Sequence, residues 1–96
     1  LLEDATAMQR AGCFAVIGEM IESKVAAEIT NSLVIPHIGI GSGPECDGQI
    51  LVSTDMLGFQ SKFYPSFVKA YANLEETILD AFRTYGREVK DNLFPE

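Results

Sequence analysis

The sequence predicts an α/β fold with parallel strands, because segments of helical periodicity alternate with short, mainly apolar runs. Residues 13–18 and 37–41 form two such runs without polar alternation, which is typical of strands buried on both faces of a parallel sheet. One helical pattern precedes the first run, and another separates the two. With 96 residues, the chain forms at most one small domain with a modest core.

Two helices are predicted in the N-terminal half. The first covers residues 2–11 and stops at Gly12, a residue that commonly ends helices. The second covers residues 24–33, with Ser23 as its N-cap. The side chains expected to face the core are Leu1, Ala5 and Met8 in the first helix and Val25, Ala26, Ile29 and Leu33 in the second.

The C-terminal half predicts a third strand and two further helices. The strand covers residues 49–53, and Tyr64-Pro65 opens a short helix. The last helix covers residues 74–90, with Asn73 and Glu76 as a capping-box-like start. The apolar sides are Phe67, Val68 and Tyr71 in the short helix and Leu74, Ile78, Phe82, Tyr85 and Val89 in the last one.

The connection between the second and third strands leaves the topology open. Only about seven residues separate them, whereas a parallel crossover usually needs about a dozen or more. The spacing by itself therefore favours a hairpin, in conflict with an all-parallel sheet.

Charge and composition exclude some classes of function. The formal net charge is −7 and the isoelectric point is about 4.5, which disfavours binding to nucleic acids and to anionic membrane surfaces. No apolar run reaches the roughly 18 residues of a membrane span. Cys13 and Cys46 form no C-x-x-C pair, so buried or idle thiols in a reducing compartment are expected.

Glu19 is the candidate catalytic residue. It follows six uncharged residues at the end of the first predicted strand. A carboxylate whose pKa burial raises can act as a general base in proton abstraction next to a carbonyl. Position alone, however, favours an acid that only caps or solvates the following loop.

The glycines Gly39, Gly41 and Gly43 suggest a phosphate-binding loop, but the spacing does not fit. The third glycine of a dinucleotide-binding fingerprint would fall at Pro44. Small residues that let a strand and loop approach their neighbours closely are the preferred interpretation.

Three other polar positions are interpreted as structural. Asp47-Gly48 is predicted to form a turn, and Asp55 to cap a short turn at residues 56–57. His37 has no partner at motif spacing. No metal site is predicted within the chain, because its acids are scattered, whereas Mg²⁺ needs clustered oxygen ligands.

Residues 38–52, IGIGSGPECDGQILV, resemble the signature I-G-I-G-A-G-x-x-x-D-G-Q-[VI]-L-V of ketopantoate hydroxymethyltransferases. The similarity continues through residues 55–58, 67–69 and 71–72. Upstream, Ala11-Gly12, the apolar run and Glu19 match the family's pattern. The resemblance covers essentially all 96 residues.

The resemblance implies that residues 1–96 are a single fragment, the C-terminal part of a (β/α)8 TIM-barrel domain. The fragment would supply about the sixth to eighth strands and the closing helices, with residues 49–53 as the last barrel strand. It would be an incomplete barrel on its own. Both ends of the sequence are interpreted as cuts within a longer protein.

The resemblance also implies a function: 3-methyl-2-oxobutanoate hydroxymethyltransferase of pantothenate biosynthesis. Such an enzyme transfers a hydroxymethyl group from 5,10-methylenetetrahydrofolate to 3-methyl-2-oxobutanoate and gives 2-dehydropantoate (ketopantoate). Glu19 matches the family's catalytic base. Many members carry Pro three residues after the base, where this chain has Glu22, so the family's loop geometry is not carried over to this chain.

Further expectations follow from the same resemblance. The Mg²⁺ ligands would lie upstream of Leu1, and the full protein would be a homo-oligomer, a decamer in the family. It would be cytoplasmic, or located in an organelle such as the mitochondrion in a plant or fungus. The alternatives are a non-catalytic truncated remnant of the enzyme and a small α/β interaction module.

Overall fold

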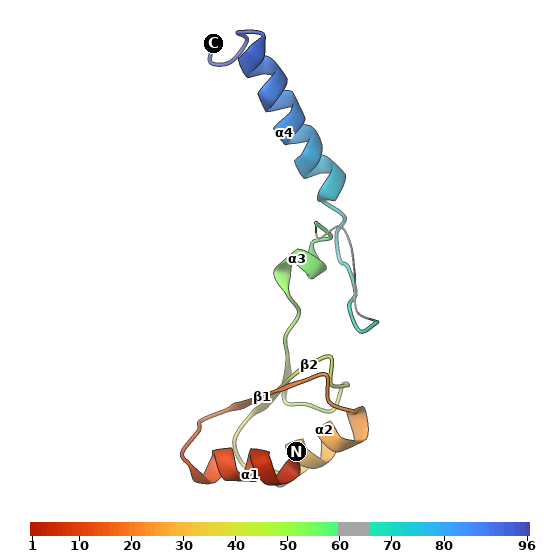
Figure 1. Ribbon diagram of the computed structural model, residues 1–96. Coiled ribbons are helices and arrows are strands. Elements are labelled where there is room, and N and C mark those ends of the chain that lie inside the picture. Colours follow the sequence, from red (N-terminus) through yellow and green to blue (C-terminus); the bar gives the residue numbers. More distant parts are fainter. Residues whose placement is uncertain (60–65) are drawn as a thin grey trace. The chain divides into compact units, whose positions relative to one another are not determined.

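The computed structural model describes residues 1–59 and 66–96, which fall into two compact units, Leu1–Leu51 and Val52–Glu96 (Figure 1). The first unit is mixed α/β with a small sheet, and the described residues of the second contain two helices. The first unit contains α1 (Leu2–Arg10), β1 (Val16–Glu19), α2 (Ser23–Ser32), β2 (His37–Ile40) and β3 (Gly48–Gln49). The second unit contains α3 (Ser53–Met56) and α4 (Glu75–Lys90).

The three strands form a parallel sheet in the order β1-β2-β3. The hairpin favoured by the short connection is therefore wrong. β2 has four residues, so the return path along it is about 13 Å, which the seven residues 41–47 can span without a helix. The predicted third strand was also too long, since β3 is two residues long and residues 51–52 are irregular.

One face of this sheet is covered by helices. α1 and α2 lie on the same side of β1 and β2 (Figure 1). The alternate residues Val16, Gly18 and His37 are buried toward them, whereas Ile17 is 66% exposed on the other face. The predicted burial of the strands on both faces is therefore wrong within the described residues, where only one face is covered.

The core lies between the helices and the covered face of the sheet. Its buried members are Ala5, Val16, Ile29 and Leu33, with Leu2, Ile21, Val25 and Ile35 packed around them. The predicted inward face of α2 is confirmed. In α1 only Ala5 is buried, and Leu1 and Met8 are exposed.

Neither predicted helix cap forms. Ser23 is the first residue of α2 and not its N-cap, which is Glu22. α4 begins at Glu75, and no side chain caps it. Instead, the backbone N–H of Glu75 donates to the carbonyl of Gly58 at 3.2 Å. A backbone carbonyl thus accepts a hydrogen bond at the start of α4, where the Asn73 side chain was predicted to be the acceptor.

The second unit departs furthest from the sequence-based expectations. Asp55 is buried within α3 and does not cap the turn at residues 56–57; its Oδ1 atom has no hydrogen-bond partner in the described part of the chain. The start of the short helix predicted at Tyr64-Pro65 lies outside the described residues. Residues 66–71, which would continue it, form a turn and irregular structure.

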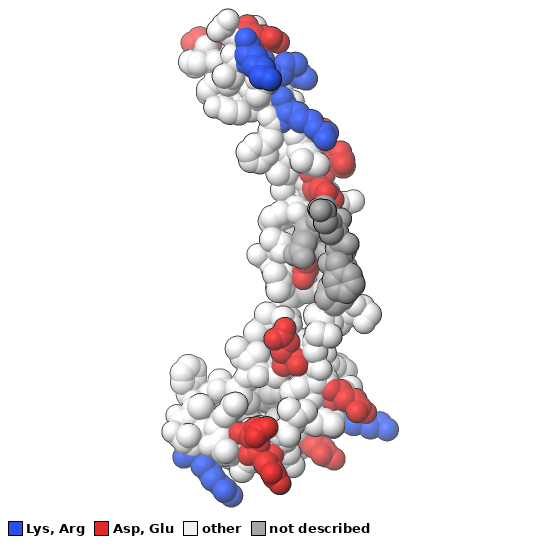
Figure 2. Space-filling view, in the orientation of Figure 1, with Lys and Arg blue, Asp and Glu red and all other residues white. Residues whose placement is uncertain are grey.

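The amphipathic pattern of α4 is present, but no residue of the helix is buried. Phe82, in the middle of the predicted apolar stripe, is 72% exposed. Tyr85 contacts only one aromatic ring among the described residues, that of Phe94, at 5.5 Å between ring centroids. On the face shown in Figure 2, basic side chains gather toward the C-terminal end of α4, while acidic side chains are spread over both units.

Candidate active site

Glu19 is the last residue of β1 and lies opposite Ile40, the last residue of β2. Since the strands are parallel, their carboxyl ends share one edge of the sheet, where α/β folds place their ligands. The Glu19 side chain is exposed and makes no hydrogen bond or ion pair within residues 1–59 and 66–96. Its carboxylate is therefore available to a ligand at this edge.

The backbone around Glu19 is held by the end of β2. The N–H of Met20 donates to the carbonyl of Ile40 at 2.8 Å. The N–H of Ile21 donates to Oγ of Ser42 at 3.1 Å, and the same hydroxyl donates to the carbonyl of Gly18 at 2.8 Å. Residues on both sides of Glu19 are thus bonded to residues 40–42. Sequence analysis missed the role of Ser42, because its partners are more than 20 residues away in the chain.

Met20 adds a local constraint next to Glu19. Its φ is 51°, in the left-handed region that residues other than glycine rarely adopt. Such conformations cost on the order of 1–3 kcal/mol and persist only where the surrounding contacts hold them; they are frequent at functional sites. The hydrogen bonds on either side of Met20 supply that restraint.

The glycine-rich segment after β2 packs closely against its neighbours. A Cβ atom on Gly39 would lie 2.7 Å from Sγ of Cys46. Gly43, at φ +83°, lies directly against Ser23 at the start of α2, and its carbonyl accepts a 2.9 Å hydrogen bond from Nε2 of Gln49. These contacts agree with the interpretation that the glycines allow close approach.

We expect Gly43→Ala to destabilise the parent protein, the longer protein that we propose carries this chain. The methyl group would overlap the Ser23 side chain at a φ that alanine disfavours, so the expected loss is about 1–3 kcal/mol. Thermal denaturation measures this loss. Gly86→Ala is the matched control, because a Cβ at Gly86 in α4 meets nothing within 4 Å. An equal melting temperature for Gly43→Ala and wild type would contradict the close contact.

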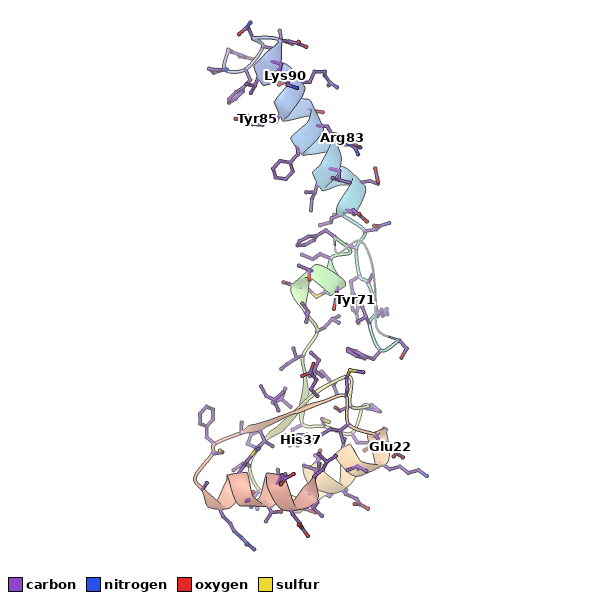
Figure 3. All side chains as sticks on the ribbon, in the orientation of Figure 1. Glu22, His37, Tyr71, Arg83, Tyr85 and Lys90 are labelled. Carbon is purple, nitrogen blue, oxygen red and sulfur yellow. The ribbon has the colours of Figure 1, made fainter. Side chains whose placement is uncertain are left out.

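His37 is a buried structural residue, as predicted. Its side chain lies in the N-terminal unit (Figure 3), with Nδ1 2.8 Å from Oγ1 of Thr30. The same hydroxyl lies 2.8 Å from the carbonyl oxygen of Ala26, so Thr30 links the His37 ring to the backbone of α2. His37 begins β2, at the opposite end of the strand from the residue that pairs with Glu19.

Asp47 and Gly48 do not form the predicted turn, which lies at residues 44–45, and Asp47 instead bonds to β2. Its Oδ2 accepts a 2.9 Å hydrogen bond from the N–H of His37, and its own N–H donates to the carbonyl of His37 at 2.9 Å. Gly48 is the first residue of β3 and not part of a turn. Asp47 thus joins the start of β3 to β2 and helps to set the parallel pairing.

Across residues 1–59 and 66–96, no three His, Cys, Asp or Glu side chains come together as a possible metal site. The described residues therefore do not fit a Mg²⁺ site of their own. Cys13 and Cys46 are free thiols. No helix in the described part of the chain is long and apolar enough to cross a membrane.

Comparison with known proteins identifies the family. Residues 1–96 match the family model of ketopantoate hydroxymethyltransferase. Similar proteins named 3-methyl-2-oxobutanoate hydroxymethyltransferase come from Trichlorobacter lovleyi (57% identical over 99% of this chain), Salinibacter ruber (52% over 100%) and Chlorobaculum parvum (50% over 99%). The chain spans only 34–36% of the length of these relatives. It belongs to the ketopantoate hydroxymethyltransferase family.

Proposed function

We propose that this chain is the C-terminal part of a 3-methyl-2-oxobutanoate hydroxymethyltransferase built as a (β/α)8 barrel. The parallel sheet, with helices on one face, supports this proposal. The other face carries Ile17, Ile38 and Ile40, the branched apolar residues that fill barrel interiors. The chain would contribute about the sixth to eighth strands and the closing helices, and the remaining strands would come from the rest of the parent protein.

Glu19 is the general base in this proposal, and its place at the carboxyl end of β1 is the observation that carries the assignment. Its carboxylate removes the proton from C3 of 3-methyl-2-oxobutanoate and leaves an enolate. The C3 carbon then forms a bond to the one-carbon unit of 5,10-methylenetetrahydrofolate, whose two bonds to folate nitrogens are broken. Water supplies the hydroxyl oxygen, and the proton taken from C3 and one from water end on the folate nitrogens. The products are 2-dehydropantoate and tetrahydrofolate. Bonds from residues 40 and 42 hold the backbone beside Glu19, which supports a base with a defined position on the chain.

The cofactor and assembly follow from the same proposal. Mg²⁺ would be held by acids of the parent protein outside this chain and would polarise the bound keto acid. The parent protein would act on small molecules, without nucleic-acid or membrane partners, which agrees with the net charge of −7. It would assemble as a homo-oligomer, a decamer as in the family, and work in the cytoplasm, or in an organelle in a plant or fungus.

The purified parent protein should form 2-dehydropantoate from 3-methyl-2-oxobutanoate when Mg²⁺ and 5,10-methylenetetrahydrofolate are present. Product formation, followed by liquid chromatography and mass spectrometry, tests this expectation. Reactions without the folate or with a chelator are the controls. A folded parent protein that forms no product under these conditions would refute the proposed function.

A further inference from the structure

Ser42 connects the two backbone segments on either side of Glu19. Its side chain is 1% exposed, and its hydroxyl uses both hydrogen-bonding capacities at once. It donates to the carbonyl of Gly18 at 2.8 Å and accepts from the N–H of Ile21 at 3.1 Å. The carbonyl of Ile40 lies at 3.4 Å as a second, weaker acceptor. A single buried hydroxyl thus fixes the residue before Glu19 and the residue two positions after it.

The loop that carries Ser42 is itself anchored. The glycines on both sides of Ser42 have positive φ angles, 63° at Gly41 and 83° at Gly43. The loop lies against the start of α2 through Gly43 and Ser23, and Gln49 of β3 donates to the Gly43 carbonyl at 2.9 Å. The Ser42 hydroxyl is therefore held in place by contacts with α2 and β3, which do not involve Glu19.

We propose that Ser42 is a positioning residue that orients the Glu19 carboxylate for proton abstraction. This inference rests on the proposed function, in which Glu19 is the base. Ser42 does not need to touch the substrate: it acts by restricting the backbone at residues 18–21. A displacement of the base by about 1 Å can cost on the order of 10²-fold in rate, so a restraint of this kind has a kinetic consequence.

Ser42→Ala removes only the hydroxyl and keeps the Cβ atom that the loop already accommodates, so the variant is expected to fold. It would leave the Gly18 carbonyl and the Ile21 N–H without their buried partner. A purely structural hydroxyl would lower stability without changing turnover, and this difference separates the two roles.

The test compares Ser42→Ala with Thr30→Ala in the parent protein. Thr30 is the control, since its half-buried hydroxyl also makes two hydrogen bonds, but with Ala26 and His37 and not with the backbone of residues 18–21. Proton exchange at C3 of 3-methyl-2-oxobutanoate gives kcat and KM. For Ser42→Ala, we expect kcat to fall about tenfold with KM changed less than twofold. For Thr30→Ala, kcat should stay within twofold of wild type.

Hydrogen–deuterium exchange at residues 18–23 provides a readout that does not depend on activity. The peptide containing the Ile21 amide should exchange faster in Ser42→Ala than in wild type and at the wild-type rate in Thr30→Ala. Unchanged exchange would mean that the Ser42 bond does not hold this segment and would overturn the inference. Faster exchange with unchanged kcat would overturn it too, and would leave Glu19 as the base.

Glu19→Gln in the same assay separates the inference from the proposed function. If this variant keeps full activity, the assignment of the base fails, and the positioning role of Ser42 fails with it, whatever the deuterium exchange shows. If Glu19→Gln is inactive and Ser42→Ala is equal to wild type, only the role of Ser42 is refuted.

Discussion

Glu19→Gln is expected to reduce proton exchange at C3 of 3-methyl-2-oxobutanoate by about 10²–10⁴-fold in the parent protein, the range typical for loss of a general base. The amide has nearly the shape of the carboxylate but does not accept a proton at neutral pH. The fold should be kept, because the Glu19 side chain is exposed and makes no hydrogen bond or ion pair in the described residues. Loss of the C3 proton signal in D₂O, followed by NMR, measures the rate.

Glu22→Gln is the control for this experiment. Glu22 is exposed three residues after Glu19, at the N-cap of α2 (Figure 3), and its replacement removes the same charge from the same loop. We expect its exchange rate to remain within a few-fold of wild type. If both variants lose activity equally, the effect is one of loop charge. If Glu19→Gln exchanges the C3 proton as fast as wild type, another residue is the base.

Elements of the first unit could be predicted well from the sequence. α1 and α2 were each predicted to within one residue at either end, and the inward positions of α2 are buried. Such patterns are local, because a helix shows its apolar face within a window of about ten residues. The end of β1 at Glu19 was also close to the prediction, although its start at Val16 was not. The choice of Glu19 as candidate base depended on the family resemblance and not on this position alone.

The contacts that shape the candidate site are not local. Ser42 and Gly18 are 24 residues apart, and Gly43 meets Ser23 across a similar distance in the sequence. Ser23 is a residue type that often caps helices, but in the structure it packs against Gly43 and does not cap α2. Local capping rules could not have predicted this use. The parallel pairing of β3 likewise depends on Asp47, which bonds to the backbone of His37.

Periodicity predicts that an apolar face exists but not what covers it. The stripe on α4 has the predicted spacing, yet Phe82, Tyr85 and Val89 are all exposed. In the sheet, the same is true of Ile17. A face of this kind is stable in water only when another surface covers it, and in the proposed barrel the rest of the parent protein would do so.

The isolated 96-residue chain is therefore expected to be inactive and to self-associate. Its exposed apolar side chains on α4 and β1 favour association with other copies. β1 and β3 are the outer strands of the sheet, and their unpaired backbone groups can pair with another chain. Size-exclusion chromatography with light scattering measures the association, and C3 exchange with Mg²⁺ measures activity.

The expected self-association and the expected inactivity can each be refuted independently. A cooperatively unfolding, monodisperse monomer would show that the exposed faces do not drive association, and would favour a small independent α/β module over part of a barrel. Turnover by the isolated chain would show that Glu19 works without the metal-binding acids that we propose for the parent protein. Adding the proposed N-terminal part of the barrel in trans distinguishes the remaining cases, because a fragment of a barrel should gain activity and lose self-association when its exposed sheet face is covered. An independent module should show no change in activity or in self-association, because it would not bind the other part of a barrel.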